Sequence, residues 1–222
     1  MHWQWLWNRG RSGDPRRAPG SIFLHRRRRV CASALVLIGM VLLGAVRPVG
    51  ASELEELNPV LTAQLYLKIL SYDRALAARS RGKLVLGILY RPEREESERV
   101  RAALQAAFIE RVGHTPVQGM GLTVTPIPLG DPKTLLKRLQ DAGVTLMYVT
   151  PGLEDATGAI TAAAQTLRAP TLTGRRSLLE SGMAIAVVIK EESPAIVINL
   201  PVAKTLGMDL DTALLRLAEV KR

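Results

Sequence analysis

Side chains that commonly carry catalysis or bind metals are scarce in this sequence. Cys31 is the only cysteine of the 222 residues, and it lies inside an apolar run near the N-terminus. Beyond residue 51 one histidine remains, His114. A metal site or a nucleophile–base pair needs several such groups placed together. We therefore expect no catalytic residue, no metal site and no cofactor, and we interpret His114 as a residue that follows a helix C-terminus.

Three other patterns could indicate a phosphate-binding loop, a divalent-cation site and a charged catalytic patch, but each has a structural explanation. The "GMG" at 119–121 precedes a strand-like stretch, whereas a phosphate-binding glycine loop joins a strand to a helix. The "DLD" at 209–211 is explained by Asp211 as the N-cap of a short helix. The acids of 93–98 alternate with arginines, which indicates a solvated helix face with ion pairs.

Loops that follow strands offer the remaining candidate site. In a parallel sheet, ligands usually bind beyond the carboxyl ends of the strands. Four residues fall in such loops: Arg91, Thr150, Thr173 and Arg175. Together they could bind a small anion. The alternative is that they are ordinary exposed loop residues, and the sequence alone favours that alternative.

The elements that would position these loops alternate between strand and helix. Strand-like stretches are expected at 83–90, 122–129, 144–150, 171–174, 182–190 and 194–200, and helices at 58–76, 92–112, 132–142, 151–170 and 177–181. The prolines at 126 and 128 place the second strand at a sheet edge. This order predicts an α/β fold, a three-layer sandwich with a mostly parallel sheet, helices on both faces and a late antiparallel hairpin.

Charge divides the chain into two parts. Residues 1–51 contain nine arginines and one acid, Asp14; removing them from totals of 30 and 20 leaves 21 basic and 19 acidic residues. The net charge of +10 therefore belongs mainly to the N-terminal part, and residues 52–222 give no reason to expect nucleic-acid binding.

The N-terminal part resembles an export signal. A run of arginines at 26–29 precedes an apolar stretch at 30–46, and small residues follow at 49–51. We expect 1–51 to be an N-terminal extension and signal peptide that is cleaved after Ala51, and 52–222 to be a single periplasmic domain. The alternative is a membrane anchor formed by the uncleaved apolar stretch.

The C-terminal half is similar to the YfiR family of periplasmic proteins. The matching positions are Thr171, Leu172, Thr173, Gly182, Met183, Ile198, Asn199, Leu200, Ala203, Gly207, Leu214, Leu215, Leu217 and Ala218. The similarity spans roughly residues 58–220 and is most specific in the closing segment. Within it we expect Gly182, Met183, Asn199 and Gly207 to be structural, and the closing leucines to cover the sheet or a second subunit.

This resemblance implies a regulatory protein without enzymatic activity. Members of the family restrain a membrane-bound diguanylate cyclase and so control cyclic-di-GMP signalling and biofilm formation. The implied partners are the periplasmic domain of an inner-membrane sensor protein and, in a homodimer, a second copy of the chain. Family members often carry cysteines that this chain lacks beyond residue 51, so redox switching through a disulfide is not expected here.

A second class of function stays open. The α/β pattern also suits a small-molecule binding protein that resembles one lobe of a transport-associated substrate-binding protein. Such carriers usually bind their ligand in a cleft between two lobes, and 52–222 has the length of one lobe.

Overall fold

A computed structural model describes residues 57–112 and 116–222. The predicted signal peptide, its cleavage site and His114 lie outside these residues. The elements in chain order are α1 (Pro59–Ser71), α2 (Leu76–Ser80), β1 (Leu84–Tyr90), α3 (Glu95–Val112), β2 (Leu122–Pro128), α4 (Pro132–Asp141), β3 (Leu146–Val149), η1 (Glu154–Ala156), α5 (Thr157–Leu167), β4 (Thr171–Thr173), α6 (Arg176–Glu180), β5 (Ile185–Lys190), β6 (Ser193–Asn199), α7 (Leu200–Thr205), α8 (Thr212–Leu217) and β7 (Glu219–Lys221).

Seven strands form one mixed sheet in the order β2-β1-β3-β4-β5-β6-β7. Strands β1 to β5 are parallel, with Leu84–Tyr90 paired along its whole length with Leu122–Pro128. β5 and β6 are antiparallel, and β7 runs parallel to β6. The α/β class, the mostly parallel sheet, the late hairpin and the edge position of β2 are confirmed.

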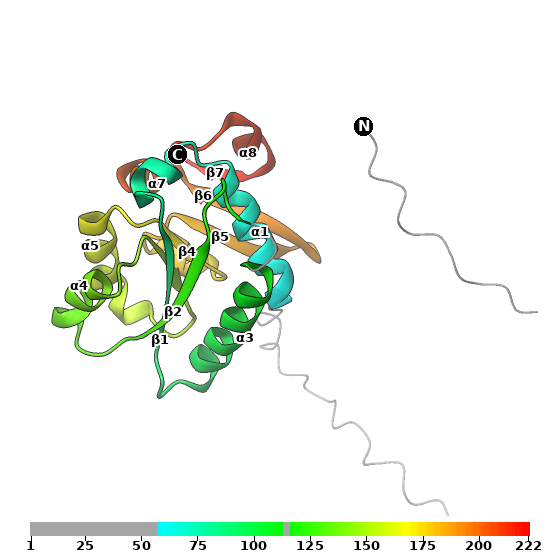
Figure 1. The fold of residues 1–222 in the computed structure, drawn as a ribbon. Coiled ribbons are helices and arrows are strands. Elements are labelled where there is room, and N and C mark those ends of the chain that lie inside the picture. The colour runs from blue at the N-terminus through cyan, green and yellow to red at the C-terminus, as the bar shows by residue number, and fades with distance from the viewer. Residues whose placement is uncertain (1–56, 113–115) are drawn as a thin grey trace, which may run out of the picture. The chain divides into compact units, whose positions relative to one another are not determined.

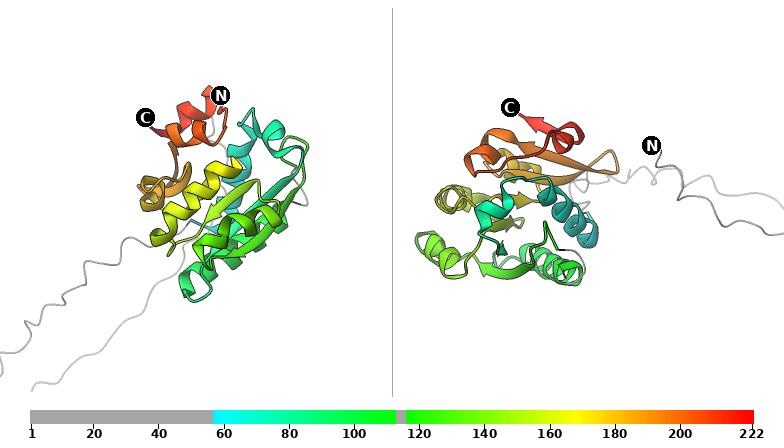
Figure 2. Two further views of the ribbon diagram at one scale, coloured as in Figure 1. Left: turned by 90° about the vertical axis from the view of Figure 1, so that its left-hand side faces the viewer. Right: turned by 45° about the horizontal axis from the view of Figure 1, so that its top comes forward.

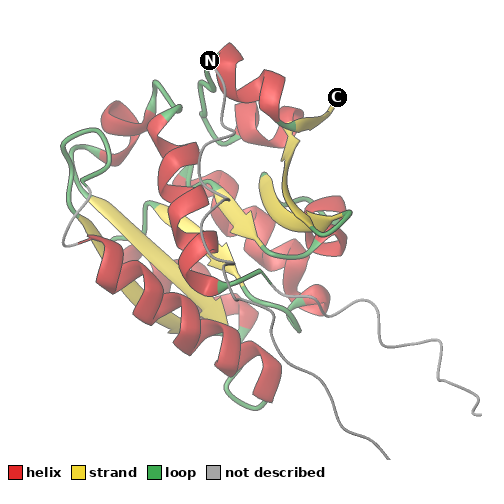
Figure 3. Ribbon diagram, turned by 90° about the vertical axis from the view of Figure 1, so that its right-hand side faces the viewer, coloured by secondary structure: helices red, strands yellow, loops and turns green. Residues whose placement is uncertain are grey.

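Helices cover both faces of the sheet, as the prediction of three layers required (Figure 1). α1 packs against α3 on one face, and α4 packs against α5 on the other. In Figure 3 the helices of the first face lie in front of the strands. The central strands β1 and β3 are apolar on both sides because both of their faces are covered.

Caps fix the helix starts that the sequence indicated. Asn58 accepts a hydrogen bond from the Val60 amide at 2.9 Å, and Asp131 accepts one from the Lys133 amide at 2.9 Å. In both helices a proline fills the first turn, where its missing N–H costs nothing.

The prediction of one helix over 58–76 is wrong. α1 ends at Ser71, and a turn around Asp73 leads into the separate helix α2. The apolar spacing continues through this turn, but the buried Asp73 carboxylate accepts a hydrogen bond from the Ala75 amide, which a continuous helix would use internally, and another from the distant Asp209 amide.

The sequence also missed the last strand. Glu219–Lys221 pairs with Val197–Asn199 and forms the outer edge of the sheet. Figure 2 shows this C-terminal segment, in red, beside the orange hairpin. Leu214 is buried, whereas Leu217 is 73% exposed and does not cover the sheet.

Candidate functional site

A cavity of about 220 Å³ lies between α1 and α3, at the carboxyl-end side of the parallel strands. Its lining comes from both helices, from β3 and β5, and from the loops after β3 and β4. The lining residues are Leu57, Asn58, Pro59, Thr62, Arg99, Val100, Ala103, Leu104, Tyr148, Pro151, Gly174, Arg175, Val187, Val188 and Ile189. This is the position where α/β sheets generally bind ligands.

Among the described lining residues, two are charged, and both are arginines from different elements. Arg99 lies in the second turn of α3, and Arg175 directly precedes α6. The Arg175 guanidinium donates a hydrogen bond to Glu96, and its side chain is 20% exposed. α3 therefore contributes one arginine to the cavity and holds the second through Glu96.

Gly174 makes room beside the Tyr148 hydroxyl. A Cβ atom built at position 174 would lie 2.9 Å from that oxygen, closer than side chains normally approach. Any larger residue would push the tyrosine or fill part of the cavity. The loop after β4 thus contributes both a cation and open space.

A second tyrosine, Tyr66 of α1, packs against the ring of Tyr148. The Tyr66 and Tyr148 rings meet edge to face, with centroids 5.7 Å apart. The Tyr66 hydroxyl donates to the Thr173 carbonyl and accepts a hydrogen bond from the Val187 amide at 3.1 Å. Burial raises the pKa of Tyr66 well above its ordinary value, so this hydroxyl stays protonated. Through these two hydrogen bonds, Tyr66 joins α1 to β4 and β5.

The four loop residues singled out in the sequence occupy different environments. Arg175 lines the cavity, but Arg91, Thr150 and Thr173 do not. The Thr150 hydroxyl donates to the Leu89 carbonyl at 2.9 Å, and the Thr173 hydroxyl donates to the Val149 carbonyl at 3.0 Å. Both threonines are fully buried, so they join neighbouring strands and do not present a hydroxyl to a small anion.

Arg91 is held in a cluster of ion pairs outside the cavity. Its guanidinium donates to Asp155 at 3.0 Å and lies 3.7 Å from Glu93. The hydrogen bond from Arg91 lowers the pKa of Asp155. Of the four candidates, only Arg175 therefore lines the cavity. Arg91 instead holds the loop after β3 through its contact with Asp155.

Sequence reasoning missed Arg99 as a cavity residue. We interpreted Arg99 together with the charged residues around it as a solvated helix face, which suits the pair of Arg101 with Glu98. The available signal was spacing: Arg99 shares one helix face with Val100, Ala103 and Leu104, and all four line the cavity.

The four residues expected to be structural lie at turns and ends. Gly182 and Gly207 have positive φ angles, 111° and 81°, which L-residues with a side chain rarely adopt. Met183 is fully buried just before β5. The Asn199 side chain accepts a hydrogen bond from the Val202 amide at 3.4 Å and so caps α7.

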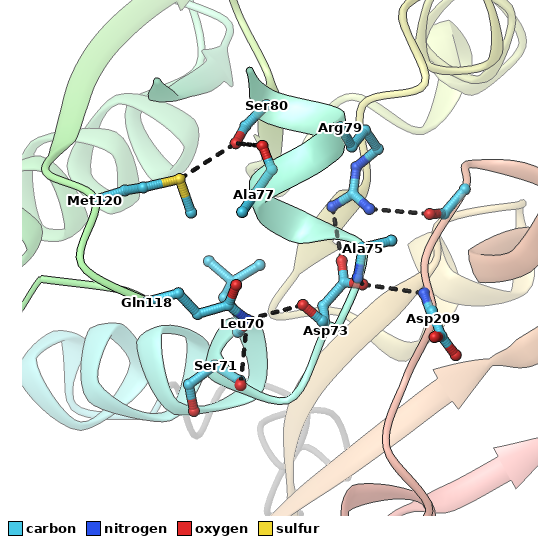
Figure 4. A network of polar contacts seen from close by, with 11 residues as sticks. Leu70, Ser71, Asp73, Ala75, Ala77, Arg79, Ser80, Gln118, Met120 and Asp209 are labelled. Carbon is cyan, nitrogen blue, oxygen red and sulfur yellow. Dashed lines mark hydrogen bonds and ion pairs between the residues drawn. The ribbon is translucent and has the colours of Figure 1, made fainter. Parts of the chain in front are cut away.

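A buried ion pair holds the C-terminal segment against the turn between α1 and α2 (Figure 4). Asp73 is fully buried, and its carboxylate lies 2.7 Å from the Arg79 guanidinium. The other carboxylate oxygen accepts from the Ala75 and Asp209 amides at 3.1 and 3.0 Å. Arg79 also donates to the Gly207 carbonyl at 3.0 Å. Neither the pair nor its partners on the distant loop were predicted from the sequence.

Asp211 caps α8, as the sequence indicated. Its side chain accepts from the Ala213 amide at 2.7 Å and also pairs with Arg74 at 2.7 Å. These two contacts account for the carboxylate without a bound cation. Within residues 57–112 and 116–222, no group of three or more histidine, cysteine, aspartate or glutamate side chains is arranged to hold a metal ion.

None of the helices that the structure describes has both the length and the apolar character needed to cross a membrane.

Comparisons with known proteins identify the fold. No family model matches the chain, and no curated protein matches it in sequence. Among solved structures, the chain is similar to the ABC domain from Streptococcus pneumonia in complex with L-Trp, with a TM-score of 0.54 and 16% identity over 72% of this chain and 60% of that chain. A conserved domain protein from Vibrio cholerae gives a TM-score of 0.57 and 16% identity, covering 75% of this chain and 61% of that chain.

A third similar structure is the substrate-binding protein CD0873 from Clostridium difficile, in its ligand-free, open form. Its TM-score is 0.51 at 12% identity, over 67% of this chain and 57% of that chain. At such identities the likeness shows the fold alone. The matches therefore support the α/β fold described above, and they span about three fifths of the solved chains.

Proposed function

We propose that residues 57–222 form a small-molecule binding domain without enzymatic activity. The observation that carries this proposal is the cavity between α1 and α3, which combines two arginines with an apolar wall at the ligand-binding end of the sheet. The fold shared with a substrate-binding protein supports the same class of function. A small-molecule binding protein is therefore favoured over a YfiR-like regulatory protein.

The regulatory role implied by the YfiR resemblance stays a prediction. This role requires a partner, the periplasmic domain of an inner-membrane sensor, and none of the observations above concerns such a partner. A binding domain of this kind is also compatible with regulation, because a ligand that orders α1 against α3 would alter the surface that these helices present.

Cavity filling provides the test. Ala103 lines the cavity on α3, whereas the neighbouring Ala102 is exposed and does not line it. Ala103→Phe should fill the cavity, and Ala102→Phe is the matched control that adds the same side chain outside it. Both positions lie in the middle of a long helix, so the backbone tolerates either change.

A thermal-shift screen of small carboxylates, amines, amino acids and sugars gives the readout. A ligand at a hundred times its Kd stabilises the folded state by about 2.7 kcal/mol. For a domain of this size that free energy raises the melting temperature by roughly 5–11 °C. The shift should persist in Ala102→Phe and disappear in Ala103→Phe. A screen in which no compound stabilises the wild type more than Ala103→Phe would overturn the proposal.

A further inference from the structure

The two arginines of the cavity already have partners of their own. Arg175 forms an ion pair with Glu96, and the Arg175 side chain is 20% exposed. Arg99 is exposed to solvent, where water and salt screen its charge, and it too has an interaction partner. The arginine charges are therefore largely compensated before any ligand binds.

An ionised ligand of either sign meets an unfavourable environment in this cavity. A ligand carboxylate that approached Arg175 would also approach the Glu96 carboxylate, and like charges at short distance repel. A ligand ammonium group would find no carboxylate among the described lining residues. A charge that leaves water without gaining a partner pays its desolvation cost uncompensated, which weakens binding.

Most of the wall favours an apolar ligand body. The aliphatic side chains and prolines of the lining are Leu57, Pro59, Val100, Ala103, Leu104, Pro151, Val187, Val188 and Ile189. A polar ligand body against this wall would lose hydrogen bonds to water without replacing them. The cavity of about 220 Å³ is small, which suits a single ring or a short branched chain.

The other polar side chains of the described lining are uncharged. They belong to Asn58, Thr62 and Tyr148. A hydroxyl or an amide can exchange a hydrogen bond with a neutral polar group of a ligand, but it carries no charge to neutralise an ion. One uncharged hydroxyl on an apolar body therefore suits this lining better than a carboxylate or an ammonium group on the same body.

We infer that the cavity binds a small uncharged molecule with an apolar body, such as an alcohol, and that Glu96 excludes anions by occupying Arg175. This inference rests on the proposed function, because it assigns a ligand class to the same cavity. Glu96 is the residue that determines the preference: without its carboxylate, the Arg175 guanidinium would face the cavity with its charge available to an anion.

Two matched series of compounds test the preference by isothermal titration calorimetry at pH 7. The first series is 3-phenylpropan-1-ol, 3-phenylpropionate and 3-phenylpropylamine, which share a body and differ in charge. The second is 4-methylpentan-1-ol, 4-methylpentanoate and 4-methylpentylamine, which repeats the comparison with a branched chain. Both series also join the thermal-shift screen. In at least one series the alcohol should bind ten-fold or more tightly than the acid and the amine.

A substitution of Glu96 tests the reason for the preference. Glu96→Gln should raise the affinity for the acid at least three-fold relative to the alcohol, because it frees the charge of Arg175. Glu95→Gln is the matched control, since it removes an exposed acid from the same first turn of α3 and should leave this ratio unchanged. Circular dichroism confirms that each variant is folded. The same ratio in Glu96→Gln and in the wild type would contradict the inference.

The outcomes separate the ligand class from the proposed function. An acid or an amine that binds the wild type as tightly as the alcohol, with binding lost in Ala103→Phe, overturns the ligand class and leaves the binding cavity in place. Absence of binding in both series, while another compound of the screen binds, also overturns the ligand class. Binding that is equal in the wild type and in Ala103→Phe overturns the proposed function itself.

Discussion

Replacing Asp73 by alanine removes the centre of the network that joins the turn after α1 to the C-terminal segment. Asp73 is fully buried and the Arg79 side chain is 9% exposed, so neither partner of the ion pair is well solvated. The substitution leaves the arginine charge without its partner. It also removes the acceptor of two backbone amides, those of Ala75 and Asp209.

The expected loss follows from this geometry. Breaking a buried ion pair by removal of one partner typically costs about 3–5 kcal/mol, because the other charge stays buried and uncompensated. For a domain of this size, that corresponds to a fall in melting temperature of roughly 6–20 °C. The loss is a large part of the roughly 5–15 kcal/mol that stabilises a typical domain.

Urea unfolding at pH 7 measures the free energy of unfolding directly. The control is Asp141→Ala, which removes the exposed pair with Lys137 and should cost less than about 1 kcal/mol. The double variant Asp73→Ala, Arg79→Met should recover part of the loss, because it leaves no isolated buried charge. If Asp73→Ala costs no more than Asp141→Ala, the ion pair does not hold this segment and the reasoning is refuted.

Two further predictions concern other parts of the fold. Tyr66→Phe should lower the free energy of unfolding by about 1–3 kcal/mol, because it leaves the buried Val187 amide without its acceptor; an unchanged urea midpoint would contradict this. The hydrogen bond from Arg176 lowers the pKa of Glu219 from 4.5 to about 2. A carboxyl with a lowered pKa contributes stability that is present above its unfolded value and is lost as the pH falls through the folded value, here between 4.5 and about 2. Glu219→Gln should therefore reduce the fall in melting temperature over that range, and identical pH profiles for the two proteins would argue against a role for this pair in anchoring β7.

Local sequence signals were sufficient to predict most of the architecture. Asn58 before Pro59 and Asp131 before Pro132 mark helix starts through side-chain chemistry that acts within three residues. The prolines of β2 exclude it from the sheet interior, because proline has no backbone N–H to donate to a neighbouring strand. Such signals need no knowledge of the rest of the chain, and the α/β class follows from their order.

The features that the sequence did not reveal depend on distant residues. Asp73 interrupts an apolar stripe, but its function as an anchor arises only when the loop that contains Gly207 and Asp209 folds against it. Arg99 has a helix position like that of its solvated neighbours, and only the placement of α3 opposite α1 makes it a cavity residue. Strand β7 lies at one edge of the sheet and is only three residues long, and a strand of this length is too short to show a periodic pattern.

The position of a bound ligand tests the central claim most directly. Crystals of residues 52–222 soaked in the compound that raises the melting temperature of the wild type most would show that position by diffraction. The account predicts electron density between α1 and α3, among the residues that line the cavity. An empty cavity at a concentration that saturates the protein in solution, or ligand density elsewhere on the domain, would contradict it.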